Sequence, residues 1–307
     1  MLGMSTYNYR RFSREILEQH SQPSFGGPAA GERAPDFKAV ALGGDTVRLS
    51  DFQGKKNVLL IFGSATCPMT ASSMAGINKL YDRFRGDDIE FLFVYVREAH
   101  PGERIPAHGS MRDKTNAARQ LRDEEDMAMP ILVDDIGGSI HRKYSRLPNP
   151  AFLIDKSGRV AFRSMWDDPE KLASAIEELL KIQHERKVEH AVVNGGQDLS
   201  RPVSYAVLYS YRALERGGEG SIKDFREALG LPANTFFAAR SRGTLLGNPG
   251  RILAVSALTA AVLAGGLYAG FELRKRRLGT RRNPYRAYEK EKVRDTETGT
   301  DYGAVGI

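Results

Sequence analysis

The sequence predicts an α/β fold with a central β-sheet and flanking helices, followed by a helical segment and a C-terminal transmembrane helix. Two apolar runs, Asn57 to Phe62 and Ile89 to Val96, are typical of strands that are buried on both faces. Apolar residues at helical spacing lie between the two runs, which indicates a β-α-β unit. The uncharged stretch from Ile252 to Phe271 predicts the membrane-spanning helix.

The elements before the first buried strand are short. Residues 7 to 20 predict a charged helix, and residues 21 to 35 form a Gly/Pro-rich linker. Residues 36 to 52 alternate between apolar and polar side chains about Gly43-Gly44, which predicts a β-hairpin. The chain therefore reaches the sheet through a hairpin.

Strands and helices alternate after the first buried strand. Asp168 followed by Pro169 is typical of a helix start, because the aspartate accepts a backbone hydrogen bond and proline fits the first turn. The other predicted elements are a helix after Cys67, a polar exposed helix at 112–125, a strand at 129–134, a short helix at 140–144, two strands that turn at 156–158, and a long helix from 168 to 190. Their order predicts a thioredoxin-like sheet with a peroxiredoxin-style N-terminal hairpin.

These elements divide the chain into five parts. The predicted parts are an N-terminal helix and linker (1–30), a thioredoxin-like domain (31–193), a helical segment or stalk (194–250), a transmembrane helix (251–273), and a basic and then polar tail (274–307).

The composition excludes several classes of protein. Hydrophobic residues make up 41% and charged residues 27% of the 307 residues, as in an ordinary soluble domain. The net charge of +7 comes from residues 240–307, because residues 1–239 hold 32 basic and 32 acidic residues, so we expect no nucleic-acid partner. The single cysteine excludes an intrachain disulfide and a cysteine-rich zinc site.

The membrane span is long enough for a bilayer, since its 20 residues correspond to a helix of about 30 Å. A buried core helix is the alternative, but such helices rarely stay apolar on every face. Gly266 and Gly270 have the GxxxG spacing that supports helix pairing, and so a possible homodimer.

The orientation of this single-pass protein rests on two observations that conflict. Close to the span, more basic residues follow it than precede it, and Arg274 to Arg277 come almost directly after it. By the positive-inside rule this places the C-terminus in the cytoplasm. The N-terminus, however, has no apolar core of the kind that a secretory signal requires. We expect a cytoplasmic redox domain held at the membrane.

Cys67 lies where chemistry is expected, between a buried strand and the start of a helix. Unpaired N–H groups and the positive end of the helix dipole favour a thiolate there, and Ser64 and Thr66 add hydroxyl groups nearby. The alternative is a cysteine that is buried and inert. The position favours a reactive thiol.

The second buried strand ends near Glu98 and His100, and parallel strands place their carboxyl ends at one edge of a sheet. Residues two apart in an extended chain point to the same side, so Glu98 could orient His100 towards Cys67, where the imidazole would carry a proton. A solvated loop is the alternative.

Several other residues receive ordinary interpretations. We expect surface positions for His108 and His141, a packing role for Trp166, and a cis peptide bond at Pro148 or Pro150.

Several short motifs together resemble the iodothyronine deiodinases. "FGSATCPM" and "FLFVYVREAHP" are similar to the family's Phe-Gly-Ser-Cys-Thr-Sec-Pro and its strand ending in Tyr-Ile-Glu-Glu-Ala-His. "MPILVD", "YSRLP" and Trp166 before Pro169-Glu170 match further family motifs, and the similarity covers about residues 55–180.

The resemblance implies a thioredoxin-fold enzyme that removes iodine reductively from iodothyronines. By position, Cys67 takes the place of selenocysteine, Ser64 and Thr66 match neighbouring hydroxyl groups, and Glu98 and His100 match an acidic residue and a histidine. Two features depart from the family: Ala65 replaces a cysteine, and the predicted anchor is C-terminal rather than N-terminal.

Three hypotheses about function follow. The first is a membrane-anchored, deiodinase-like thiol oxidoreductase that acts on a small molecule and has no bound cofactor. Because the chain has no second cysteine to reduce the oxidised Cys67, the reductant would be an external thiol such as glutathione or a thioredoxin. The second is a one-Cys peroxidase, although Leu60 stands where peroxiredoxins have proline. The third is a non-enzymatic membrane scaffold. An acidic thiol would favour the two enzymes.

Overall fold

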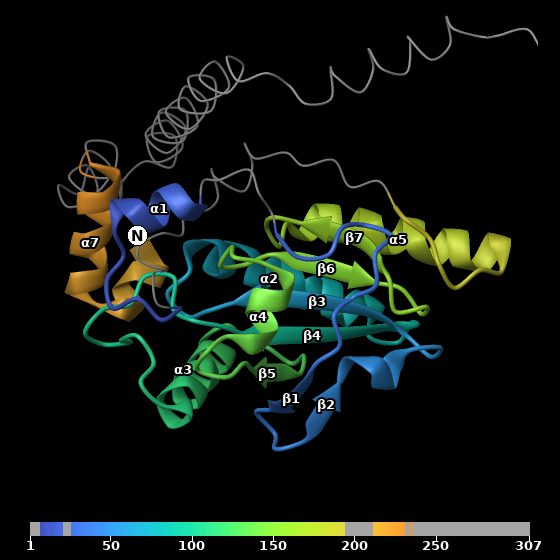
Figure 1. Ribbon diagram of the computed structural model, residues 1–307, viewed down its shortest axis with the longest axis horizontal. Helices are drawn as coiled ribbons and strands as arrows, with labels where there is room; N and C mark the ends of the chain where they lie inside the picture. The colour runs from blue at the N-terminus through green and yellow to red at the C-terminus, as the bar shows by residue number, and fades with distance from the viewer. Residues whose placement is uncertain (1–6, 21–25, 194–210, 231–233, 235–307) are drawn as a thin grey trace, which may run out of the picture. The chain divides into compact units, whose positions relative to one another are not determined.

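The computed structural model describes residues 7–20, 26–193, 211–230 and 234 (Figure 1). The predicted order of the hairpin, strands and helices of the sheet domain is confirmed. In chain order the elements are α1 (Arg14–His20), β1 (Lys38–Ala41), β2 (Thr46–Arg48), the 3-10 helix η1 (Leu49–Phe52), β3 (Asn57–Gly63), α2 (Pro68–Phe84), β4 (Ile89–Tyr95), α3 (Met111–Glu124), β5 (Ile131–Val133), α4 (Ser139–Tyr144), β6 (Ala151–Ile154), β7 (Val160–Ser164), α5 (Pro169–Arg186) and α7 (Glu219–Leu229).

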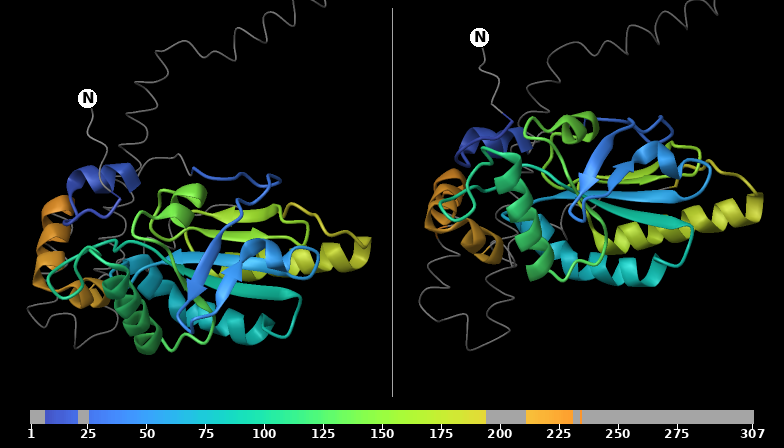
Figure 2. Two further views of the ribbon diagram at one scale, coloured as in Figure 1. Left: turned by 60° about the horizontal axis from the view of Figure 1, so that its bottom comes forward. Right: turned by 90° about the horizontal axis from the view of Figure 1, so that it is seen from below.

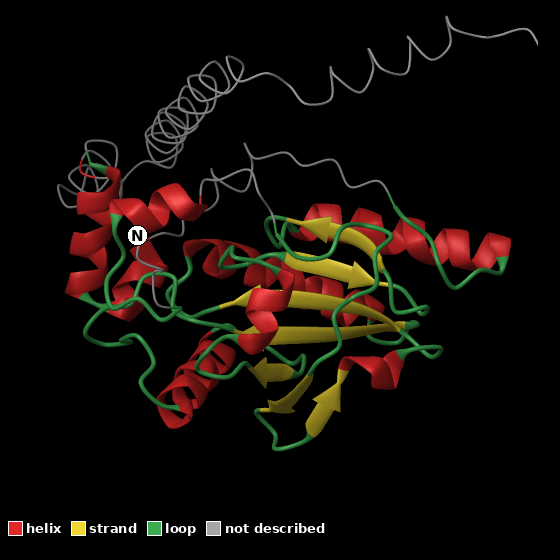
Figure 3. Cartoon of the chain, viewed as in Figure 1, coloured by secondary structure: helices red, strands yellow, loops and turns green. Residues whose placement is uncertain are grey.

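One mixed sheet contains all seven of these strands, in the order β2-β1-β5-β4-β3-β6-β7. Strands β3, β4 and β5 are parallel, whereas β1, β2, β6 and β7 join by antiparallel pairing. This is the predicted thioredoxin-like arrangement, and helices lie on both sides of the sheet (Figures 2 and 3). The carboxyl ends of β3 and β4 lie next to each other, because Gly63 pairs with Tyr95.

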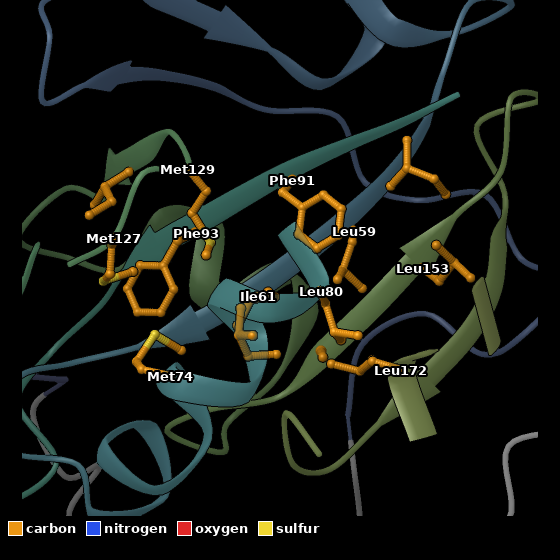
Figure 4. Packing of buried hydrophobic residues seen from close by; sticks show 14 of the residues in the cluster. Leu59, Ile61, Met74, Leu80, Phe91, Phe93, Met127, Met129, Leu153 and Leu172 are labelled. Carbon is orange, nitrogen blue, oxygen red and sulfur yellow. The ribbon is translucent and has the colours of Figure 1, made fainter. Parts of the chain in front are cut away.

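The central strands divide their side chains between two cores, as the period of two in a β-strand requires. In β3, Leu59 and Ile61 face a core that is completed by α2, α3 and α5 (Figure 4). Leu60 and Phe62 face a second core, formed with α4 and η1. Both faces are buried, which explains the continuous apolar run.

Two helices differ from the prediction. The polar helix α3 is not simply exposed, since its residues Lys114, Ala118 and Leu121 are buried against the sheet domain. The first helix begins at Arg14 rather than at residue 7, because the preceding aromatic side chains pack inward. Tyr9, for example, is buried and donates a hydrogen bond to the carbonyl oxygen of Ala99 at 2.8 Å.

The helix starts follow the capping rules. The carboxylate of Asp168 accepts a hydrogen bond from the N–H of Glu170, which confirms the predicted start of α5. Cys67 is the N-cap of α2, with extended backbone angles and Pro68 in the first turn. The nucleophile candidate therefore lies at the end of a helix that packs directly on the sheet.

Helical structure also follows the sheet domain. Residues 211–217 are helical and α7 comes next, so two parts of the predicted helical segment are present. Helix α7 lies beside α1, where Arg11 forms an ion pair with Asp224 at 2.5 Å (Figure 1). The two segments thus pack together although they are about 200 residues apart in the chain.

The membrane prediction concerns residues that the structure does not describe. Within the described ranges, every helix is too short or too polar to cross a bilayer. The stretch from Ile252 to Phe271, with Gly266 and Gly270, lies outside those ranges. The transmembrane helix and the pairing through glycines stay predictions.

Gly138→Ala is expected to destabilise the protein by about 2 kcal/mol more than Gly44→Ala. Both glycines have a positive φ, 71° and 97°, which costs about 1 kcal/mol for alanine. At Gly138 a Cβ atom would also lie 2.0 Å from the ring of Tyr7, whereas Gly44 has no atom within 4 Å of that position. Urea unfolding of the two variants measures the difference, and equal losses would contradict this packing.

Candidate functional site

The thiol of Cys67 is enclosed. Only 1% of the residue is exposed, and the side chains of Met69, Ala99 and Trp166 pack around it. These neighbours come from α2, from the loop after β4 and from the loop after β7, so three separate segments close the site. The predicted packing role of Trp166 is confirmed.

Burial decides the protonation of this thiol. Desolvation raises the pKa of Cys67 to about 11, although the N–H groups of Thr70 and Met69 at the start of the helix act in the opposite direction. The nearby carboxylate of Asp167 raises the pKa further. The expectation that the helix N-terminus yields a thiolate is therefore wrong for this closed arrangement, because the helix effect is smaller than the cost of burying a charge.

A buried carboxylate lies next to the cysteine loop. Oε2 of Glu98 accepts hydrogen bonds from the N–H of Thr66 at 2.9 Å and from its hydroxyl at 2.6 Å. Oε1 of Glu98 lies 3.0 Å from Nε2 of His108. Desolvation alone would raise the pKa of Glu98, but the hydrogen bonds and charge of these partners hold it below its ordinary value. Glu98 is therefore ionised inside the protein.

Tyr95, the last residue of β4, extends this network. Its hydroxyl donates to Oε1 of Glu98 and accepts a hydrogen bond from the N–H of Ala65 at 3.2 Å. Desolvation, the charge of Glu98 and its hydrogen bond raise the pKa of Tyr95 well above the ordinary value. The neutral hydroxyl thus connects the carboxylate to the loop that precedes Cys67.

His100 does not have the predicted partner. Its ring packs against Phe12, with centroids 4.2 Å apart, and against Phe225, at 5.2 Å. Its Nδ1 is buried without a hydrogen-bond partner, and its backbone N–H donates to the hydroxyl of Thr66 at 3.0 Å. Desolvation lowers the pKa of His100 to about 3, so the imidazole is neutral at physiological pH.

The predicted pairing of Glu98 with His100 is wrong, because Glu98 bonds to His108 instead. The expectation that His108 lies on the surface is wrong as well, since the residue is only 4% exposed. The sequence held no periodic signal for His108, which belongs to an irregular loop and whose ring lies near that of Tyr95 at the end of β4. His141, also expected at the surface, is buried, and its ring lies within hydrogen-bond distance of the hydroxyl of Tyr7 and the carbonyl of Leu147.

The two hydroxyl groups near Cys67 position the loops. The hydroxyl oxygen of Ser64 accepts a hydrogen bond from the N–H of Ala99 at 3.2 Å, and Thr66 contacts both Glu98 and His100. The loop before α2 is therefore joined to the loop after β4 by side-chain bonds. Their predicted closeness is confirmed.

Asp167 is a buried acid that the sequence interpretation missed. Its carboxylate accepts hydrogen bonds from Ser73 and from Asn149, both at 2.7 Å. Burial raises the pKa of Asp167 to about 7. Asp167 directly precedes the helix cap Asp168. Two consecutive aspartates at the start of a helix are usually exposed, so the sequence did not indicate that Asp167 is buried.

The peptide bonds before Pro148 and Pro150 are both trans, so the predicted cis-proline is absent. Among the described residues, no three or more His, Cys, Asp or Glu side chains lie together so as to hold a metal ion.

The sequence of this chain is similar to those of known proteins. A family model described as iodothyronine deiodinase matches residues 6–171, more than half of the chain. The chain is 28% identical to the type I iodothyronine deiodinase of Xenopus laevis over 185 residues, which are 56% of this chain and 71% of that protein.

Two further relatives match a smaller share of their own length. Identity to the thyroxine 5-deiodinase of Rattus norvegicus is 28% over 158 residues, which are 48% of this chain and 49% of that protein. Identity to the thiol-disulfide oxidoreductase ResA of Bacillus thuringiensis is 30% over 132 residues, 42% of this chain and 66% of that protein. The chain thus spans about half the length of the former and two thirds of the latter.

Proposed function

Because this chain belongs to the iodothyronine deiodinase family, we propose that it uses Cys67 to remove a halogen, or a comparable oxidised atom, from a small molecule. Membership of this family supports an enzyme with oxidoreductase activity. The observation that carries the proposal is the position of Cys67 at the N-cap of α2, beside the buried network of Thr66, Glu98 and His108.

Because burial keeps Cys67 protonated, the proposed step begins with transfer of the thiol proton to a base as the substrate binds, and the resulting thiolate attacks the halogen. A sulfur–halogen bond forms while the carbon–halogen bond breaks, and its electron pair stays on the carbon, which then takes up a proton. The substrate is reduced by two electrons and the cysteine is oxidised to a sulfenyl halide. The step therefore requires one deprotonated thiol and one proton donor.

We assign the movement of the proton to the network beside the thiol. His108 and the ionised Glu98 are directly bonded, and Glu98 reaches the cysteine loop through Thr66. His100 remains a candidate for contact with the substrate, because its buried Nδ1 has no other partner. Since His100 is neutral, its imidazole carries a single N–H.

Recovery of Cys67 requires thiols from outside. Thr70 stands three residues after Cys67, where a Cys-x-x-Cys motif has its second cysteine. A first external thiol would displace halide from the sulfenyl halide and form a mixed disulfide, and a second thiol would release Cys67 as the free thiol. Glutathione and a thioredoxin are the proposed reductants.

The purified chain with excess dithiothreitol tests the proposal. We expect iodide release from iodinated phenols, and we expect Cys67→Ser to abolish it while the melting temperature changes little. Peroxide consumption without iodide release would favour the one-Cys peroxidase instead. A folded protein with neither activity would contradict both enzymes and leave the scaffold hypothesis.

We propose in addition that residues 252–271 anchor the chain and that the redox domain faces the cytoplasm. The uncharged length of the stretch supports an anchor, and the need of Cys67 for an external thiol supports the compartment in which glutathione and thioredoxin keep thiols reduced. Protease digestion of membrane vesicles tests it. Cleavage of the domain in right-side-out vesicles, with protection in inverted ones, would contradict the proposal.

A further inference from the structure

A buried cation from outside the family match contacts the loop before Cys67. Arg216 lies in the helical residues 211–217, well beyond residue 171, where the match ends. Its side chain is 5% exposed. Nη1 of Arg216 donates a hydrogen bond to the carbonyl oxygen of Ala65 at 3.2 Å. An arginine that is distant in sequence thus reaches a residue two positions before the nucleophile.

Two carboxylates orient this guanidinium group. Nε donates to Oε2 of Glu124 at 2.5 Å, and Nη2 donates to Oε1 of Glu125. Glu124 is the last residue of α3, and the side chain of Glu125 is 7% exposed. Because the guanidinium is planar and three of its nitrogen atoms are engaged, its direction towards Ala65 is set.

The N–H groups of the cysteine loop already have partners, such as Oε2 of Glu98 for the N–H of Thr66. The N–H of Ala65 donates to the hydroxyl of Tyr95, and the N–H of Cys67 donates to the carbonyl of Ser64 at 3.2 Å. The carbonyl of Ala65 is the point at which Arg216 adds a charged donor. We propose that Arg216 is a positioning residue for Cys67, which fixes this loop and thereby the direction in which the thiol is presented.

The same part of the chain also holds the loop that carries His100. The hydroxyl of Ser221 in α7 donates to the carbonyl of His100 at 2.6 Å, and Phe225 packs on its ring. A Cβ atom on Gly102 would lie 2.2 Å from the carbonyl oxygen of Gly217, so the two backbones are in close contact. Residues 211–229 therefore contact both loops of the proposed site, and Arg216 makes the contact closest to Cys67.

Arg212 offers a matched control. It lies one helical turn from Arg216, and it approaches the same carboxylate, Glu125, at 3.4 Å. It also donates to the backbone carbonyl of Glu124 at 3.2 Å, but its side chain is 51% exposed and its bonds go to α3 and Glu125. Arg212→Met removes a cation from the same helix and leaves the proposed positioning bond in place.

The test compares Arg216→Met, Arg216→Lys and Arg212→Met in the full chain. Methionine keeps much of the stem of Arg216 and removes its donors, so we expect kcat for iodide release to fall by about tenfold or more, because small displacements of a reacting group are costly. Lysine keeps the charge and should restore part of the rate. We expect Arg212→Met to stay within about twofold of the original chain.

A second readout is the pH profile of Cys67 modification by iodoacetamide, which needs no substrate. If Arg216 positions the loop, Arg216→Met loosens it and shifts the profile to lower pH, because the thiol gains solvent, while Arg212→Met leaves it unchanged. Equal profiles in both folded variants, or equal losses of activity, would overturn the proposal. Although the role rests on the proposed function, failure of iodide release in the original chain would not affect this comparison of the profiles.

Discussion

Replacing Glu98 by leucine is expected to lower the free energy of unfolding by about 4 kcal/mol. The carboxylate is 2% exposed and bonds to the N–H and hydroxyl of Thr66, to Tyr95 and to His108. Leucine leaves these buried polar groups without a hydrogen-bond partner. The free energy lost with these hydrogen bonds exceeds the free energy gained by burying the leucine side chain. Urea unfolding at pH 7 measures the change.

Two further variants separate the charge from the bonds. Glu98→Gln keeps the shape of the side chain, but only one of its two terminal atoms can accept hydrogen bonds. We therefore expect a smaller loss of about 2 kcal/mol. Glu90→Gln, in the strand β4 that precedes Glu98, breaks only the partly exposed pair with Lys56 and should cost less than about 1 kcal/mol. A loss at Glu98 no larger than that at Glu90 would show that the buried network does not stabilise the fold.

Acid is expected to destabilise the protein by about 4 kcal/mol between pH 6.5 and pH 4.5. Burial lowers the pKa of His20, His100 and His141 to about 3, whereas an unfolded histidine binds a proton near pH 6.5. Towards the acid end of this window the unfolded chain therefore binds three more protons through these residues, and stability is lost as the pH falls. Asp167 acts in the opposite direction, because its pKa is raised to about 7 and the folded chain binds its proton first.

At the acid end of the window the balance is about two protons, or about 2.7 kcal/mol per pH unit. The raised pKa of Asp134 reduces the slope, and the lowered pKa of Glu98 steepens it further at still lower pH. Urea unfolding at the two pH values measures the slope. Asp167→Asn removes the opposing group and should make the slope steeper, so a flatter slope in that variant would refute the assignment.

The order of the strands and helices of the sheet domain could be predicted because local spacing encodes it. The run from Asn57 to Phe62 is apolar at every position, as a central strand with a core on each face must be. The N-terminal aromatic residues were assigned to a helix, since sequence does not show that Tyr9 packs beneath the loop of Ala99.

The sequence predicted where the site residues lie in the fold, but not which side chains they bond to. The strand ends placed Cys67 and Glu98 at the same edge of the sheet, and the structure joins their loops through Thr66. His108 was missed because the fold of an irregular loop follows from long-range packing. Arg216 was missed because its contact with Ala65 joins residues about 150 positions apart.

The sequence by itself determined that the only cysteine caps a helix after a buried strand, because apolar spacing and a proline in the first turn are local properties. Only the tertiary structure decided the state of that cysteine. Met69, Ala99 and Trp166 remove water from the thiol, and Asp167 adds a nearby negative charge. Desolvation depends on every segment that packs against a group, so it can oppose, and here exceeds, the effect of the helix to which the group belongs.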